Sequence, residues 1–115
     1  MSRHDDSVSL RHMLDHAREA AELTKDGCRA DLDKDRKLSL ALTRLLEIMG
    51  ESAARVSTQF MTNHPEIPWS QIVGLRNRLI HGYDNINHDR VWQIIHYDLP
   101  LLIASLEKIV PDQEG

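Results

Sequence analysis

Paired cysteines and a long apolar run are both missing from this chain. Cys28 is the only cysteine, so an intramolecular disulfide is impossible and a cysteine-based zinc site is not expected. No apolar run approaches the ~20 residues that a membrane-spanning helix needs. The first six residues have no apolar stretch after Arg3, so we expect no secretory signal. These absences favour a protein of the reducing cytoplasm, without membrane contact.

The chain also lacks an excess of positive charge. Its 14 basic and 18 acidic residues give a net charge of −4, which excludes a bulk polycation. Any contact with nucleic acid must therefore use a local basic site. No repeat, low-complexity tract or Pro/Gly/Ser-rich linker divides the 115 residues, of which 41% are hydrophobic and 28% charged. This composition is typical of a soluble globular protein, and we predict one domain, residues 1–115.

Apolar residues recur every three or four positions along almost the whole chain, which predicts helices and no sheet. We expect four helices, at about residues 8–25, 34–63, 69–81 and 89–110. Ser7 is the expected N-cap of the first helix, and Pro100 is expected to kink the last one. The predicted fold class is all-α, an antiparallel four-helix bundle with room for a short extra helix.

The last predicted helix carries a second apolar strip opposite its inward face. Ile94, Tyr97 and Leu101 make up this strip. On a small bundle it fits a dimer surface, and it fits scattered surface apolar residues equally well. The sequence leaves both interpretations open.

The third predicted helix places a charged side chain on its apolar face. At about 100° per residue, Arg76 falls in the middle of the arc formed by the apolar residues at positions 69, 72, 75, 79 and 80. An arginine there is costly unless it is paired or functional. It either forms a salt bridge to Glu47 or Glu51, or it binds an anion in a groove. Asn77 and His81 are four residues apart, so we expect neighbouring side chains.

These residue types suffice to cleave RNA without a metal. His81 would accept the proton of a ribose 2′-OH group. Arg76 would hold the phosphate while its charge rearranges, and Asn77 would orient the histidine. The expected product end is a 2′,3′-cyclic phosphate. One arginine and one histidine are few groups for this chemistry, and a symmetric dimer would double them.

The segment 74–83, Gly-Leu-Arg-Asn-Arg-Leu-Ile-His-Gly-Tyr, matches the motif Arg-x4-His-x-Tyr. Further matches are Gly50-Glu51-Ser52-Ala53 in the long helix, Pro68-Trp69 before the motif, and Val91-Trp92 and Asp98-Leu99-Pro100 after it. With these flanks the chain resembles the HEPN-domain ribonuclease toxins of the HepT type, over about residues 10–110. The resemblance implies a HEPN helical bundle, a homodimer, and a composite cleft in which two motifs cut RNA without metal or cofactor.

The resemblance also implies roles for single residues. Arg76 and His81 correspond to the catalytic pair, and Asn77 to a supporting residue. Tyr83 corresponds to the tyrosine to which an MntA-like minimal nucleotidyltransferase antitoxin attaches AMP, in a type VII-like toxin–antitoxin system. AMP on Tyr83 would place bulk and negative charge beside Arg76.

Two other functions compete with the nuclease. One is a non-catalytic HEPN module that docks onto a nucleotidyltransferase or binds nucleotide. The other is a plain dimerisation domain, in which Arg76 would be salt-bridged and sealed from solvent. Within the nuclease hypothesis, the substrate is transfer RNA or messenger RNA, and DNA binding is not expected.

Other polar residues carry weaker signals. Arg78 and Arg90 flank the motif and are candidate RNA contacts through phosphate. His12 and His16 lie one helical turn apart, but no third ligand is evident and no metal site is expected. His88 falls in a turn predicted at residues 83–88 and is assigned no role.

Overall fold

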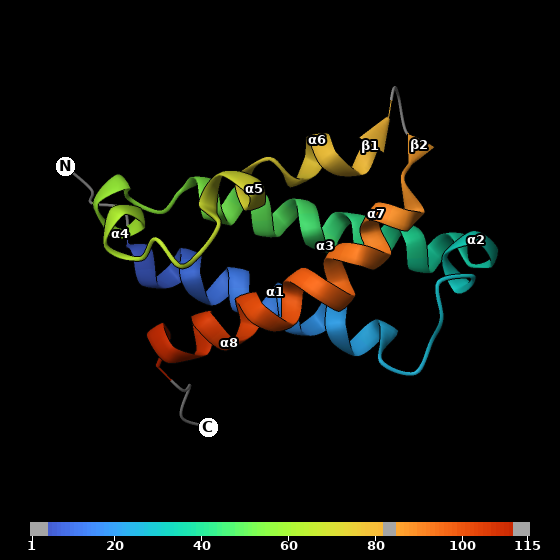
Figure 1. Cartoon of the computed structure of the whole chain (residues 1–115), viewed down its shortest axis with the longest axis horizontal. Coiled ribbons are helices and arrows are strands. Elements are labelled where there is room, and N and C mark those ends of the chain that lie inside the picture. Colours follow the sequence, from blue (N-terminus) through green and yellow to red (C-terminus); the bar gives the residue numbers. More distant parts are fainter. Residues whose placement is uncertain (1–4, 82–84, 112–115) are drawn as a thin grey trace.

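The computed structural model describes residues 5–81 and 85–111. Helices α1 (Asp6–Thr24) and α3 (Arg36–Ala54) lie side by side and make the most extensive contact between elements (Figure 1). Helix α8 (Leu99–Ile109) packs on α1, whereas α5 (Trp69–Val73) and α6 (Leu75–Leu79) pack on α3. The predicted all-α class is confirmed.

Aspartate side chains cap the two long helices. Asp5 Oδ1 accepts a hydrogen bond from the Ser7 N–H at 3.0 Å, so α1 begins at Asp6 and the predicted N-cap Ser7 lies inside the helix. Asp35 Oδ1 accepts from the Leu38 N–H at 3.1 Å, and α3 follows directly. Aspartate suits these positions because its carboxylate satisfies amides that have no intrahelical acceptor.

The single helix predicted at residues 34–63 is instead two helices, because α4 (Thr58–Asn63) follows α3 after a break at 55–57. A short helix, α2 (Asp31–Lys34), ends just before α3 begins. Ser57 has an extended backbone with ψ 150°, and its Oγ accepts from the Phe60 N–H at 3.2 Å, so it starts a new helix. Val56 in the break is only 5% exposed. The apolar spacing therefore continues through the break and conceals it.

The last predicted helix contains a π-helical turn. Helix α7 (His88–Gln93) leads into the π turn η1 (Ile94–Asp98), and α8 follows. Pro100 lacks the N–H that a regular helix would use at this point, and the π turn directly precedes it. Ile94, predicted to face outward, is buried, while Tyr97 and Leu101 of the same strip are exposed.

The helix predicted at residues 69–81 is wrong in its second half. Gly74 separates α5 from α6, and α6 ends at Leu79. The next residues form strand β1 (Ile80–His81), which pairs antiparallel with β2 (Asn85–Ile86). Ile80 lies opposite Ile86, and His81 lies opposite Asn85. This short ladder is the one departure from an all-helical chain among residues 5–81 and 85–111.

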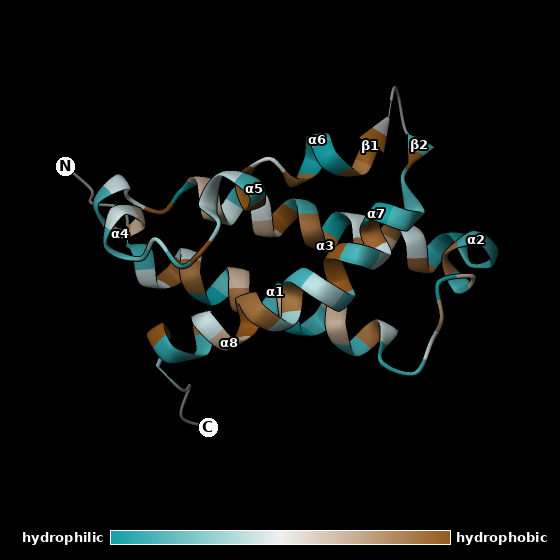
Figure 2. Ribbon diagram, viewed as in Figure 1, coloured by the Kyte–Doolittle hydropathy of each residue, from teal (hydrophilic) through white to brown (hydrophobic). Residues whose placement is uncertain are grey.

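The core lies between α1, α3, α8 and the α5–α6 segment. Its most deeply buried large side chains, each at most 1% exposed, include Met13, Leu14, Leu42, Leu46, Met49, Leu79, Leu99 and Leu106. Figure 2 shows a hydrophilic ribbon at α6 beside the hydrophobic β1, so the motif helix presents polar residues at the surface. In the part of the chain that is described, no helix combines the length and apolar character that crossing a bilayer requires.

Candidate functional site

Arg76 lies on the surface, although its spacing predicted a place on the apolar face. Its side chain is 78% exposed, and its Nε lies 3.7 Å from Glu47 Oε2 on α3. The break at Gly74 explains the difference, because a helical projection cannot be carried from α5 into α6. Of the two partners that the sequence allowed for a salt bridge, Glu47 and Glu51, Arg76 lies beside Glu47, and the arginine is not sealed from solvent.

Two shallow hollows on the outer face of α3 meet at Glu47. One, of about 270 Å³, lies between α3 and the strand pair, with Ile80 and Ile86 on its far side. The other, of about 220 Å³, lies between α3 and the α5–α6 segment, and Arg76 borders it. We call these two hollows the α3 groove. Its basic residues are Arg36, Arg44 and Arg76, which brings three guanidinium groups together on a chain of net negative charge.

Glu47 lies between two of these arginines. Arg44 Nη1 is 3.6 Å from Glu47 Oε1 and 3.4 Å from Glu51 Oε2, and its side chain is 60% exposed. Such long, solvent-open ion pairs contribute little to stability. They leave most of the guanidinium donors of Arg44 and Arg76 facing water, where an anion can reach them.

Gly50 allows the α5–α6 junction to lie close against α3. A Cβ atom at position 50 would lie 2.8 Å from the Ile72 carbonyl oxygen and 3.5 Å from that of Val73. Both carbonyls belong to the backbone just before Gly74, so a side chain at position 50 would push α6 outward. Gly50 therefore positions Arg76, and the flanking match at residues 50–53 is the only sequence signal for that role.

His81 and Asn77 do not share a helix. The predicted spacing of one helical turn fails because α6 ends at Leu79 and His81 lies in β1. Asn77 is exposed on α6. The backbone of His81 is fixed by pairing with Asn85, while its side chain and the whole of Tyr83 lie outside the described part of the structure.

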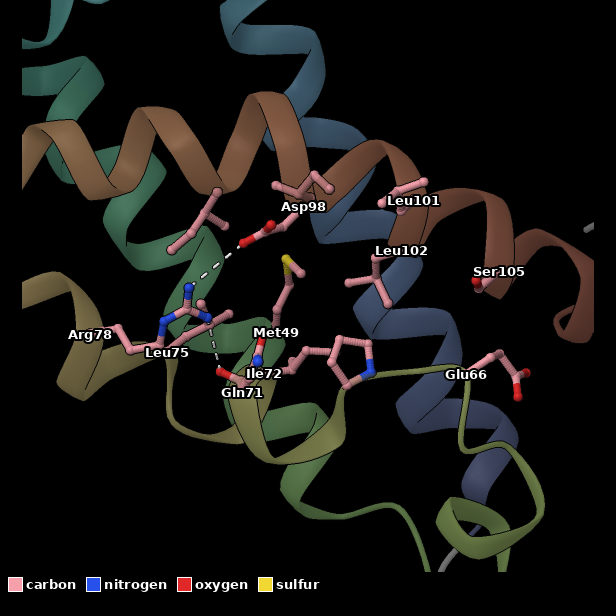
Figure 3. Close-up of a pocket in the computed structure, with 13 residues that line it drawn as sticks. Met49, Glu66, Gln71, Ile72, Leu75, Arg78, Asp98, Leu101, Leu102 and Ser105 are labelled. Atoms are coloured by element: carbon pink, nitrogen blue, oxygen red, sulfur yellow. Dashed lines mark hydrogen bonds and ion pairs between the residues drawn. The ribbon is translucent and has the colours of Figure 1, made fainter.

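Arg78 faces the opposite side of α6 from Arg76. It points toward η1 and lines a cavity of about 240 Å³ between the α5–α6 segment and the η1–α8 segment (Figure 3). The Nη2 atom of Arg78 lies 3.7 Å from Asp98 Oδ2, and its Nη1 donates to the Gln71 carbonyl at 3.5 Å. Arg90 lies exposed on α7. The structure thus separates Arg78 from the α3 groove.

A second polar cluster joins α2, α3 and α7. His88 Nε2 lies 2.9 Å from Ser39 Oγ, and His88 Nδ1 lies 2.8 Å from Asp33 Oδ1. Arg29 contacts Asp33 at 3.0 Å and Asp89 at 2.6 Å. The hydrogen bond from His88, and then that from Arg29, lower the pKa of the Asp33 carboxyl below its usual value. Sequence spacing assigns His88 no role, because its partners lie 49 and 55 residues away along the chain.

Among residues 5–81 and 85–111, no group of three or more His, Cys, Asp or Glu side chains is arranged to hold a metal ion.

The chain is similar to known proteins along most of its length. The family model described as "Ribonuclease HepT-like" matches residues 13–109. A "Putative RNase" of Methanocaldococcus jannaschii is 31% identical over 115 residues, covering 100% of this chain and 95% of the relative. A second "Putative RNase" of that organism is 34% identical, covering 93% and 98%. The "Probable ribonuclease HepT" of Thermococcus cleftensis is 35% identical, covering 76% and 80%.

No solved structure gives a significant match to the chain. The family model covers far more than half of the sequence, and the matched region contains the whole of α3, α5, α6 and the strand pair. Together with the helical bundle and the motif in the sequence, this match identifies the chain as a member of the HepT-like ribonuclease family.

Proposed function

We propose that this protein is a metal-independent endoribonuclease, the toxin of a type VII-like toxin–antitoxin pair. The observation that carries the proposal is the solvent-open guanidinium of Arg76, 78% exposed, at the edge of a groove with two further arginines. A structural arginine would be satisfied within the fold. This one keeps donors available for a phosphate, and the family match supplies the class of reaction.

The reaction that we propose is a transesterification at one phosphate of the RNA chain. His81 accepts the proton of the ribose 2′-OH, and that oxygen attacks the adjacent phosphorus. The bond from phosphorus to the 5′-oxygen breaks, and the departing oxygen takes up a proton. The products are a 2′,3′-cyclic phosphate and a free 5′-hydroxyl. Arg76 stabilises the charge on the non-bridging oxygens during the step, and Asn77 supports the site.

We further propose that two copies of the chain form one site. Leu40 and Val73, exposed at 46% and 42%, border the two hollows of the α3 groove. Covering these apolar side chains with a second copy would bring two Arg76 residues into one cleft. Sedimentation of Leu40→Asp tests this arrangement, since a buried interfacial carboxylate would shift the protein to monomer. A dimer that persists in Leu40→Asp would place the interface elsewhere.

Neutralisation would follow from modification of Tyr83, two residues after His81. In the proposed reaction the tyrosine oxygen attacks the α-phosphorus of ATP on an MntA-like antitoxin, and pyrophosphate leaves. The phosphodiester of the resulting AMP carries one negative charge, which would compete with RNA for Arg76.

The test is RNA cleavage in excess EDTA by protein shown by mass to carry no AMP. Arg76→Ala and His81→Ala should abolish cleavage. Arg18→Ala, which removes an arginine paired with Glu107 at 2.8 Å on the α1–α8 side, should cleave like the wild type. Transfer RNA and messenger RNA are both offered. Absence of cleavage by the unmodified wild type would refute the nuclease and favour a module that docks onto a nucleotidyltransferase.

A further inference from the structure

We propose that His88 is a positioning residue for the cleavage site. Together with Ser39 and Asp33 it forms a clamp that holds the strand carrying His81 against α3. This inference rests on the proposed ribonuclease function and adds a residue that lies outside the Arg-x4-His motif. The three residues are called the His88 clamp below.

Both ring nitrogens of His88 are used to join separate elements. His88 is the first residue of α7, and its side chain is 25% exposed. Its Nε2 reaches Ser39 Oγ on α3 at 2.9 Å, and its Nδ1 reaches Asp33 Oδ1 on α2 at 2.8 Å. A histidine suits this task because its two nitrogens point in different directions from one rigid ring.

Arg29 reinforces the clamp from the side. Its Nη1 lies 3.0 Å from Asp33 Oδ2, so each carboxylate oxygen of Asp33 has a separate partner. Its Nε lies 2.6 Å from Asp89 Oδ1, the residue after His88. The start of α7 is therefore tied to the α2 region through two consecutive residues.

The clamp acts on the motif through a short run of backbone. Ile86 in β2 pairs with Ile80 in β1, and Asn85 pairs with His81. The Asn87 N–H donates to the Leu79 carbonyl at 2.7 Å, which closes the base of the hairpin. His88 follows directly. A shift of His88 would therefore move β2 and, through the ladder, the backbone of His81.

The arginine and the histidine strand of the motif are therefore both held against the same helix, α3. Arg76 meets α3 at Glu47, and the His81 strand is held to α3 at Ser39 through His88. Positions 39 and 47 are about 12 Å apart along a helix axis. Because α3 is a single rigid helix, it fixes the separation of the arginine from the histidine strand.

A nucleophilic role for Ser39 can be set aside. The order Ser39–His88–Asp33 has the connectivity of a hydrolytic triad. Ser39, however, is 3% exposed and lies within α3, so a substrate carbonyl or phosphate has no access to its oxygen. The geometry therefore fits a structural link and not a second catalytic centre.

The first measurement is steady-state RNA cleavage by His88→Ala, with Arg18→Ala as the control. Arg18→Ala removes an interhelical contact of similar length, 2.8 Å, at the α1–α8 joint. We expect kcat of His88→Ala to fall about 10- to 100-fold, because small misplacements of a reacting group have effects of this size. KM should stay within about twofold, since the groove arginines are untouched. Arg18→Ala should retain both constants.

Two conservative variants test the clamp itself. The amide nitrogen of Asn at position 88 lies near the place of Nδ1 and can keep the bond to Asp33. The amide of Gln reaches the place of Nε2 and can keep the bond to Ser39. Each should recover part of the kcat lost in His88→Ala. If His88→Ala lowered kcat only through a general loss of stability, the Asn and Gln variants would not recover it. A wild-type kcat in His88→Ala would overturn the inference.

Hydrogen exchange gives a readout that does not need nuclease activity. In His88→Ala the Asn87 amide should exchange at least about tenfold faster than in the wild type, and in Arg18→Ala it should not change. Equal exchange in His88→Ala and the wild type would overturn the clamp. Faster exchange in His88→Ala, together with a wild-type protein that never cleaves RNA, would instead refute the proposed function and leave the clamp standing.

Discussion

Replacing Gly50 with alanine has two opposing effects on stability, and we expect the destabilising one to be the larger. In an open position on a helix, Gly→Ala stabilises by about 1 kcal/mol, because glycine loses more backbone entropy on folding. At Gly50 the new Cβ would lie 2.8 Å from the Ile72 carbonyl oxygen, about 0.6 Å inside the 3.4 Å at which ordinary contact begins.

The obstacle is backbone, so it cannot move aside as a flexible side chain would. Overpacking of this kind typically costs about 1–3 kcal/mol. After the gain in helix propensity, we expect Gly50→Ala to lose up to about 2 kcal/mol in the free energy of unfolding. The α5–α6 junction should also move outward, and RNA cleavage should fall with it, because Arg76 follows two residues after Gly74.

Urea unfolding followed by circular dichroism measures the free energy directly. Ala41→Gly, at an exposed position of the same helix, reports the propensity effect alone and should destabilise by about 1 kcal/mol. A Gly50→Ala protein that is more stable than the wild type by about 1 kcal/mol would refute the reasoning. It would mean that the α5–α6 junction does not press on α3.

Three further outcomes are expected. Asp33→Asn should destabilise at pH 7. Because His88 and then Arg29 lower the folded pKa of Asp33, its contribution is present above the ordinary value of 3.8 and is lost as pH falls through the lowered folded value. The difference in urea midpoint should therefore shrink as pH falls below 3.8, and a constant difference would contradict it. Leu79→Ala should cost about 2–5 kcal/mol in thermal or urea unfolding, because Leu79 is 0% exposed, and a loss below 1 kcal/mol would show a loosely packed motif. Glu47→Gln should change stability by less than about 1 kcal/mol, because Arg76 is 78% exposed. It should tighten RNA binding in fluorescence anisotropy by freeing Arg76 and Arg44, and weaker binding would contradict the role of the groove.

The helical class and most inward-facing residues could be predicted from apolar spacing alone. Seven residues spaced three or four apart are buried or half-buried, at positions 38, 42, 45, 49, 52, 56 and 60. Packing repeats with the helix period whether or not the helix is continuous. For the same reason, the sequence does not reveal where the helices break. At Ser57 the apolar spacing keeps its period across a new N-cap. Before Pro100 a π turn inserts an extra residue, and no sequence pattern marks it.

The site was predictable by residue type and less so by geometry. The sequence points to Arg76 and to Glu47 or Glu51 as its partner. Its spacing puts the arginine on an apolar face, because a single helical projection does not hold across Gly74. The link from His88 to Ser39 and Asp33 could not be found, because it joins residues far apart in sequence and needs the folded bundle to bring them together.

The shortness of α6 has a consequence for temperature. A helix of five residues is far below the ~12–15 needed for marginal helicity in water, so α6 is helical only while it rests on α3. Its opening would cost less than unfolding of the α1–α3 pair, which makes the most extensive contact between elements. Activity should therefore disappear on heating before the bulk helicity does, and a peptide containing only residues 69–90 would be inert.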